Sequence, residues 1–166
     1  MTDDVGQAIA AAADARRAES LSLLAGLVAA GREGTAAIER RVEAAMEAAG
    51  CTCEAFEYEP ASVPLVEEFA RDDVAAKGAA RCVIGRSAGS GAGRSILLFA
   101  HPDTEPFRTD PAWRGDPFEP VARQGRLHGW GVPDALAGPA LMPQSLAVPR
   151  APGPPPHLTR SGPART

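Results

Sequence analysis

The stretch Ser95-Ile-Leu-Leu-Phe-Ala-His101-Pro-Asp103-Thr-Glu-Pro106 is the part of the sequence that most directly predicts the fold. Its five consecutive apolar residues are followed at once by a histidine and, two residues later, by a carboxylate. This order is typical of a buried strand that carries polar side chains to the rim of a sheet. We therefore predict a strand over 95–100, with His101 and Asp103 at its carboxyl end.

Two helices are predicted before this stretch. An alanine- and leucine-rich segment from Asp4 to about Gly31 predicts one long helix, with Gly31 as its C-terminal stop. A second helix is predicted over 35–49, and Gly50 ends it. Its apolar residues recur at helical spacing, and charged residues occupy the other face. The apolar residues are Ile38, Val42, Met46 and Ala49, and the charged ones are Glu39, Arg40, Glu43 and Glu47.

Two further strands are predicted between these helices and the opening stretch. Residues 51–58 indicate a half-exposed strand, and 81–84 form a short apolar run. Residues 65–69 predict one short helical turn. The glycine-rich segment 85–93 lacks the Gly-Lys-Ser/Thr ending of a phosphate loop, so we interpret it as a flexible connection between neighbouring strands. Helices followed by strands predict an α/β layered domain.

The segment after the opening stretch predicts a long ordered loop and then a tight backbone path. Residues 104–120 are rich in proline but also contain Phe107, Trp113 and Phe118, which need partners to pack on. Residues 125–138 contain four glycines around a single acid, Asp134. Such a glycine density predicts a close approach of the backbone to another group.

Composition excludes several classes of protein. The net charge is −4 and Lys77 is the single lysine among 17 basic residues, so no basic stripe exists for nucleic acid. No apolar run approaches the length of about 20 residues that a membrane span requires. The three cysteines lack a C-x-x-C spacing, and no signal peptide is apparent. We therefore expect a soluble protein of the reducing cytoplasm.

The C-terminal part of the sequence differs abruptly from the rest. The 32 residues after Asp134 contain eight prolines and no acid, and the net charge changes from −7 before this point (14 basic, 21 acidic) to +3 after it. Such a segment cannot bury enough apolar surface to offset its ordering entropy. We predict disorder or polyproline structure from about Pro149 onward.

Histidine and carboxylates at the end of the predicted strand suggest a metal site. His101 offers a neutral nitrogen ligand, and Asp103 is placed to accept the other imidazole proton and fix the tautomer. Asp134 could add a second oxygen ligand. Two alternatives stay open on spacing alone: His101 and Asp103 in a solvated surface turn, and Asp134 as a turn-forming residue.

Five submotifs occur in a specific order and spacing. They are Leu97-Leu-Phe-Ala-His101-Pro-Asp103-Thr-Glu-Pro106, Trp113, Asp116-Pro-Phe118, Gly125-Arg-Leu-His-Gly-Trp-Gly131 and Asp134. Together they resemble the N-terminal part of the dinuclear zinc metallohydrolase family, which includes acetylornithine deacetylase, succinyl-diaminopimelate desuccinylase, aminoacylase and carboxypeptidase G. The resemblance implies a zinc-exopeptidase-like catalytic domain, with helices packed on a mixed sheet.

The resemblance also implies roles for three residues and a reaction. His101 resembles a ligand of one zinc ion, Asp103 the catalytic-site acid that orients it, and Asp134 the carboxylate that bridges two zinc ions. The implied reaction is hydrolysis of the amide bond of an N-acyl amino acid or a peptide by a metal-bound water. Metallopeptidase or deacylase activity is therefore the expected chemistry, with a small molecule or peptide as substrate and no implication for oligomeric state.

The sequence departs from the family after Asp134. The family continues with a Glu-Glu pair, further ligands and a lid domain, whereas no acid follows Asp134 here. We therefore predict a truncated catalytic domain over 1–142 and a Pro/Arg-rich tail over 143–166, with weak or absent zinc binding and no activity for this chain. His128, His157 and the cysteines Cys51, Cys53 and Cys82 are interpreted as packing or solvated residues rather than ligands.

Two other interpretations are retained. The chain could be a non-catalytic interaction protein that uses its N-terminal helices and its proline-rich tail, in which Pro149-Arg-Ala-Pro152 has P-x-x-P spacing. It could also be a gene fragment whose incomplete sheet exposes an edge and aggregates.

Overall fold

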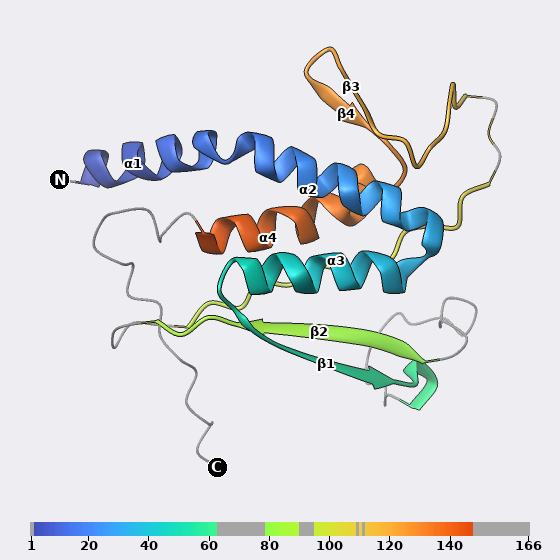
Figure 1. Ribbon diagram of the computed structural model, residues 1–166, viewed down its shortest axis with the longest axis horizontal. Helices are drawn as coiled ribbons and strands as arrows, with labels where there is room; N and C mark the ends of the chain where they lie inside the picture. The colour runs from blue at the N-terminus through green and yellow to red at the C-terminus, as the bar shows by residue number, and fades with distance from the viewer. Residues whose placement is uncertain (1, 63–78, 90–94, 109, 111, 148–166) are drawn as a thin grey trace, which may run out of the picture.

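The computed structural model describes residues 2–62, 79–89, 95–108, 110 and 112–147, and it combines helices with two small antiparallel sheets (Figure 1). The helices are α1 (Thr2–Ala15), α2 (Arg17–Ala30), α3 (Thr35–Ala48) and α4 (Ala137–Ala147), with short turns η1 (Gly31–Glu33), η2 (Pro60–Ser62) and η3 (Val132–Leu136). The strands are β1 (Thr52–Tyr58), β2 (Ala80–Arg86), β3 (Val121–Arg123) and β4 (Arg126–His128). This mixture agrees with the predicted α/β class at the level of its elements.

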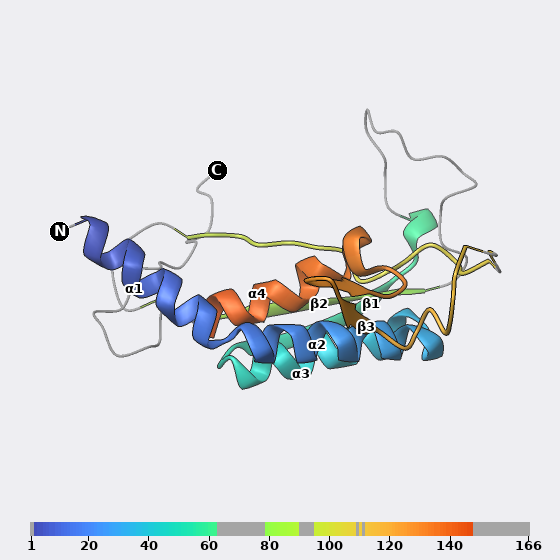
Figure 2. The same ribbon diagram turned by 90° about the horizontal axis from the view of Figure 1, so that it is seen from above.

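The core lies where three helices meet. Helices α2, α3 and α4 pack against one another, and α3 also packs against β1 and β2, so it lies between helices and sheet (Figures 1 and 2). The most deeply buried side chains come from all three helices and from η3: Leu27, Val28, Ile38, Leu136 and Pro143. The burial of Leu136 and Pro143 brings the segment after Asp134 into the core.

The predicted helix at 35–49 is confirmed as α3. Its apolar residues Ile38, Val42 and Met46 are buried. Gly50 ends the helix with φ at +82°, a left-handed conformation that glycine adopts without strain. The amide of Gly50 donates to Glu47 O at 2.8 Å, and that of Cys51 donates to Met46 O at 2.9 Å.

The single long helix predicted from Asp4 to Gly31 is instead two helices. The chain breaks at Arg16, whose backbone has φ −97° and ψ 3°. The Arg16 side chain contacts Glu19 at 2.7 Å and donates from Nε to Gln144 Oε1 of α4 at 2.9 Å. A contact with a distant helix therefore accompanies the break, and no glycine or proline marks it in the sequence.

The predicted strands at 51–58 and 81–84 are confirmed as β1 and β2. They pair antiparallel, with Thr52 opposite Arg86 and Tyr58 opposite Ala80. Gly85 lies so close to α3 that a Cβ built on it would be 2.7 Å from Met46 Sδ. Glycine at this position therefore lets the strand approach the helix.

The strand predicted over 95–100 is wrong. These residues form no regular element, and Ile96, Leu97, Leu98 and Phe99 are exposed rather than buried. A strand that is apolar on both faces needs neighbouring strands and covering helices. Among the described residues, the sheet of β1 and β2 has no further strand, so the apolar run finds no partner there.

The long loop after the opening stretch is ordered over its described part, as predicted. Phe107 lies at the centre of an aromatic cluster with ring centroids 5.0 Å from Trp130, 6.1 Å from Phe118 and 6.3 Å from Trp113. The chain then forms the β3–β4 hairpin, whose turn residues Gln124 and Gly125 have φ values of 52° and 72°. Two central residues with positive φ are typical of a tight type I′ hairpin turn.

Several predictions fall wholly or partly on residues outside the described part. These are the helical turn at 65–69, residues 90–93 of the glycine-rich connection, His157, and the tail from 148 onward. Helix α4 runs across the predicted boundary between 142 and 143, and that division stays a prediction. No helix in the described ranges combines the length and apolar character needed to cross a membrane.

Candidate metal-binding site

His101, Asp103 and Asp134 lie together, although they come from separate parts of the chain. Asp103 Oδ1 is 3.2 Å from His101 Nδ1, and Asp134 Oδ1 is 3.5 Å from His101 Nε2. The histidine is thus flanked by a carboxylate at each ring nitrogen. All three side chains are accessible, with exposed fractions of 56% for His101, 69% for Asp103 and 80% for Asp134.

Close backbone contacts hold the two segments of this site together. A Cβ on Gly138 would be 2.9 Å from Ala100 Cβ, and one on Gly131 would overlap Thr104 Cγ2. Trp130 Nε1 also donates to the carbonyl oxygen of Glu105 at 2.7 Å. The close approach predicted for the glycine-dense segment is therefore confirmed, and it is made to the residues on either side of His101 and Asp103.

Asp134 is placed by an irregular turn at the start of α4. Its backbone is non-helical, with φ −136° and ψ 89°, and its peptide bond to Ala135 is cis. Two residues later the side chain of Leu136 is buried, and its amide donates to Gly131 O at 2.9 Å. Leu136 therefore anchors the turn in the core while the Asp134 carboxylate stays at the surface.

The distances fit the donor set of a cation. A tetrahedral zinc site with ordinary bond lengths separates a nitrogen and an oxygen ligand by about 3.3–3.5 Å. The Nε2 to Oδ1 separation of 3.5 Å matches this value. In the neutral tautomer whose Nδ1 donates to Asp103, Nε2 carries no proton, and the arrangement suits a cation between Nε2 and Asp134. In a doubly protonated ring, Nε2 would face Asp134 as a donor instead.

Two candidate donors for a cation, His101 Nε2 and Asp134 Oδ1, lie close together in this part of the structure. Across the described ranges, no group of three or more His, Cys, Asp or Glu side chains is arranged to hold a metal ion. His128 lies on β4, where its Nε2 is buried and makes no hydrogen bond to the described residues. Cys51, Cys53 and Cys82 form no disulfide bond among the described residues. His101 and Asp134 would therefore supply only two of the four ligands of a tetrahedral metal site.

The loop beside the site is fixed to η1, the turn that follows α2. Asp116 forms an ion pair with Arg32, which also lies over the ring of Phe118 at 5.5 Å from its centroid. The amide of Phe118 donates to Asp116 Oδ1 at 2.9 Å. This amide, and then Arg32, hold the pKa of Asp116 below its usual range. These contacts fix the loop that carries the aromatic cluster.

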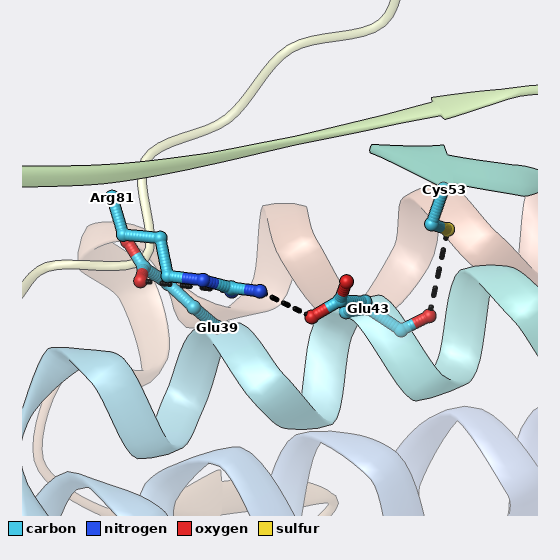
Figure 3. Close-up of polar contacts among 4 residues, drawn as sticks. All are labelled: Glu39, Glu43, Cys53 and Arg81. Atoms are coloured by element: carbon cyan, nitrogen blue, oxygen red, sulfur yellow. Dashed lines mark hydrogen bonds and ion pairs between the residues drawn. The ribbon is translucent and has the colours of Figure 1, made fainter. Parts of the chain in front are cut away.

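A second polar cluster joins α3 to the sheet (Figure 3). Arg81 extends from β2 toward α3, where its Nη2 donates to Glu43 Oε2 at 2.5 Å and its Nη1 lies 4.0 Å from Glu39 Oε2. The Sγ atom of Cys53, on β1, lies 3.8 Å from the backbone carbonyl oxygen of Glu43. We call Glu39, Glu43 and Arg81 the α3–β2 charge cluster.

Glu39 links this cluster to the candidate metal site. Its side chain is buried to 8% exposure, and burial raises its pKa above the usual range, against the opposing effect of Arg81. The negative charge of Asp103 makes a smaller contribution that also raises the pKa of Glu39. Burial is also the main cause of the raised pKa of the Cys53 thiol.

The sequence placed Glu39 and Glu43 on the charged face of the helix but gave no indication that a sheet covers them. Glutamates four residues apart share one face of a helix. An arginine at the start of the short apolar run 81–84 was the available signal, because it faces α3 once β2 packs on that helix. Sequence periodicity identifies such a face, but not what packs on it.

Comparison with known proteins gives a similarity over part of the chain. The chain is similar to the succinyl-diaminopimelate desuccinylases of Buchnera aphidicola subsp. Acyrthosiphon pisum strains Tuc7 and 5A, with 38% identity over 52 residues in each case. The matched segment is 31% of this chain and only 14% of the length of the relatives. No family model and no solved structure matches the chain. The similarity supports a hydrolase-like origin at the level of a broad peptidase family.

Proposed function

We propose that this chain carries the first half of a zinc site of the dinuclear metallohydrolase type, whose chemistry is hydrolysis of amide bonds in N-acyl amino acids or peptides. The observation that supports it is His101 between two carboxylates, with its Nε2 3.5 Å from Asp134 Oδ1. The partial similarity to desuccinylases supports the same chemistry. In this proposal His101 and Asp134 are the ligands, and Asp103 is a positioning residue.

Each residue has a separate task in the proposed site. Asp103 accepts the Nδ1 proton of His101, which fixes the ring and directs the bare Nε2 toward Asp134. Asp134 supplies a carboxylate oxygen from a turn anchored by Leu136. A bound zinc ion would polarise a substrate carbonyl and lower the pKa of a water molecule.

The same residues predict weak zinc binding and no appreciable hydrolysis by this chain. Catalytic zinc sites use three protein ligands, whereas two donors are paired here. Half of the binding free energy of a full structural zinc site, about 5–8 kcal/mol, corresponds to a dissociation constant of about 1–200 µM. His101, Asp103 and Asp134 also leave no further carboxylate to take a proton from water.

Zinc titration of the full chain tests this proposal. We expect calorimetry to detect zinc binding in the range given above, and His101→Ala and Asp134→Asn to abolish it. Asp103→Asn should weaken binding by about tenfold, because it removes the partner that orients the ring. It should also change the side-chain ¹⁵N shifts of His101, which report the tautomer and which a purely structural role would leave unchanged.

Glu119→Gln is the matched control, because this exposed acid lies in the same loop region but outside the site. It should bind zinc as the unmodified chain does. Zinc binding that survives loss of His101 and Asp134 would contradict the proposed ligands. Zinc-dependent hydrolysis of N-acetyl amino acids at rates typical of enzymes would contradict the prediction of inactivity.

A further inference from the structure

Trp130 joins the two ends of the loop beside the candidate site. Its indole Nε1 donates to Glu105 O at 2.7 Å, near the start of this loop. Its backbone amide donates to Pro117 O at 2.8 Å, near the end of the loop. Both acceptors are backbone carbonyl oxygens, so these two hydrogen bonds fix the path of the chain itself. One residue therefore closes the loop from 105 to 117.

The same residue connects the two segments that carry the acids of the site. Glu105 is two residues after Asp103, and Trp130 is four residues before Asp134. The turn that carries Asp134 is anchored at its other end by the buried side chain of Leu136. The hydrogen bond from Trp130 to Glu105 therefore links a fixed turn to the neighbour of Asp103.

Aromatic neighbours hold the indole ring in the orientation that this hydrogen bond needs. The ring centroid of Phe107 lies 5.0 Å from that of Trp130, with an angle of 85° between the rings. The ring of Trp113 lies 5.8 Å away. Edge-to-face packing at such distances favours one ring orientation over others. The cluster therefore sets the direction in which Nε1 donates.

We propose that Trp130 is a positioning residue that holds Asp134 at its distance from His101. The inference rests on the zinc site proposed above, in which Trp130 contacts neither the cation nor a substrate. Its indole N–H acts through Glu105 O on the segment of His101, and its backbone leads into the turn that carries Asp134. Loss of the N–H should let the two segments separate, so that the distance of 3.5 Å between His101 Nε2 and Asp134 Oδ1 increases.

Trp130→Phe tests the proposal, because it keeps an aromatic ring in the cluster and removes the N–H donor. We expect the dissociation constant for zinc, measured by calorimetry on the full chain, to rise by about 2- to 10-fold, the range covered by one hydrogen bond. In the metal-free chain, the substitution should also change the side-chain ¹⁵N shifts of His101. A residue that only stabilises the loop would leave these shifts unchanged.

Trp113→Phe is the matched control, since Trp113 lies in the same aromatic cluster but outside the link between residues 105 and 130. It should leave the zinc affinity and the shifts of His101 unchanged. Trp130 is then the single tryptophan of the chain. Its biosynthetic replacement by benzothienylalanine keeps the shape of the bicyclic ring and removes the N–H, which gives the same test if Trp130→Phe does not fold.

Unchanged His101 shifts after loss of the Trp130 N–H would overturn the positioning role, and so would an unchanged zinc affinity. Equal effects of Trp113→Phe and Trp130→Phe would also overturn it, because the aromatic cluster rather than the N–H would then be responsible. If the unmodified chain binds no zinc, the proposed function fails, and the His101 shifts of the metal-free chain decide the positioning role by themselves.

Discussion

Arg81 and Arg86 lie five residues apart on β2 and illustrate how burial changes the energetic weight of an ion pair. Arg86 Nη1 contacts Glu54 at 2.7 Å, with both side chains more than 60% exposed. Arg81 contacts Glu43 at 2.5 Å, with exposed fractions of 23% and 24%, and lies beside the buried Glu39. Solvent screens the first pair, whereas the second neutralises acids that α3 and β2 partly remove from water.

Arg81→Met should therefore destabilise the fold much more than Arg86→Met. Loss of Arg81 leaves Glu39 and Glu43 close together without a cation, at a cost of about 2–4 kcal/mol in the free energy of unfolding. Loss of Arg86 should cost less than about 1 kcal/mol. Urea denaturation followed by circular dichroism measures both values at neutral pH. Equal losses for the two variants would contradict a stabilising role for the α3–β2 charge cluster.

At the scale of single residues, the sequence predicts which side chains lie together in the candidate site better than it predicts which side chains are buried. Residue type and spacing single out His101, Asp103 and Asp134, and in the structure each of the two carboxylates lies within 3.5 Å of the histidine ring. Their roles as ligands and positioning residue stay predictions. The burial of Glu39 was not predictable, because it depends on a strand that lies about 40 residues later in the chain.

At the scale of elements, segments with strong local signals were predicted correctly. α3, β1 and β2 each have a regular pattern and a clear boundary residue, such as Gly50 after α3. The break at Arg16 was missed because it accompanies a contact with α4, and the strand over 95–100 was wrong because strand formation requires a partner. Local pattern predicts the conformation an element favours, while distant contacts decide whether it forms.

The irregular turn before α4 depends on glycine in a way that can be measured. Gly131 and Gly125 have nearly the same left-handed φ, 74° and 72°. A Cβ on Gly125 would meet open space, whereas one on Gly131 would collide with Thr104 and lie 3.2 Å from Leu136 Cδ1. The pair therefore separates the cost of backbone strain from the cost of the contact that holds the candidate site together.

Gly125→Ala should cost about 1–2 kcal/mol, the strain of a left-handed alanine. Gly131→Ala should cost about 2–5 kcal/mol, because overpacking against Thr104 adds to the same strain. It should also weaken zinc binding, since it displaces the segment next to Asp103. Denaturant unfolding and zinc titration of both variants measure these effects. Indistinguishable variants would show that the contact between residues 104 and 131 is unimportant.

At the scale of the whole molecule, the candidate site depends on packing that lies elsewhere. The site residues are exposed, but Ala100 lies against Gly138, and Leu136 is buried in η3, which packs against α2 and α4. The three-helix core therefore fixes the separation between His101 and Asp134. A destabilised core should consequently affect the site even where no site residue is changed.

Helices α1 and α3 differ in their contribution to that core, and this difference predicts how the molecule opens. Both contain 14 residues, but the described side chains of α1 are almost all exposed, and the helix extends away from the body (Figures 1 and 2). An isolated helix shorter than about 12–15 residues is marginal in water, so α1 should open independently of the core. In hydrogen exchange followed by mass spectrometry, amides of 6–14 should therefore exchange at least about tenfold faster than those of 38–46. Equal exchange rates in the two helices would mean that α1 is held by the cooperative fold, and would contradict the prediction.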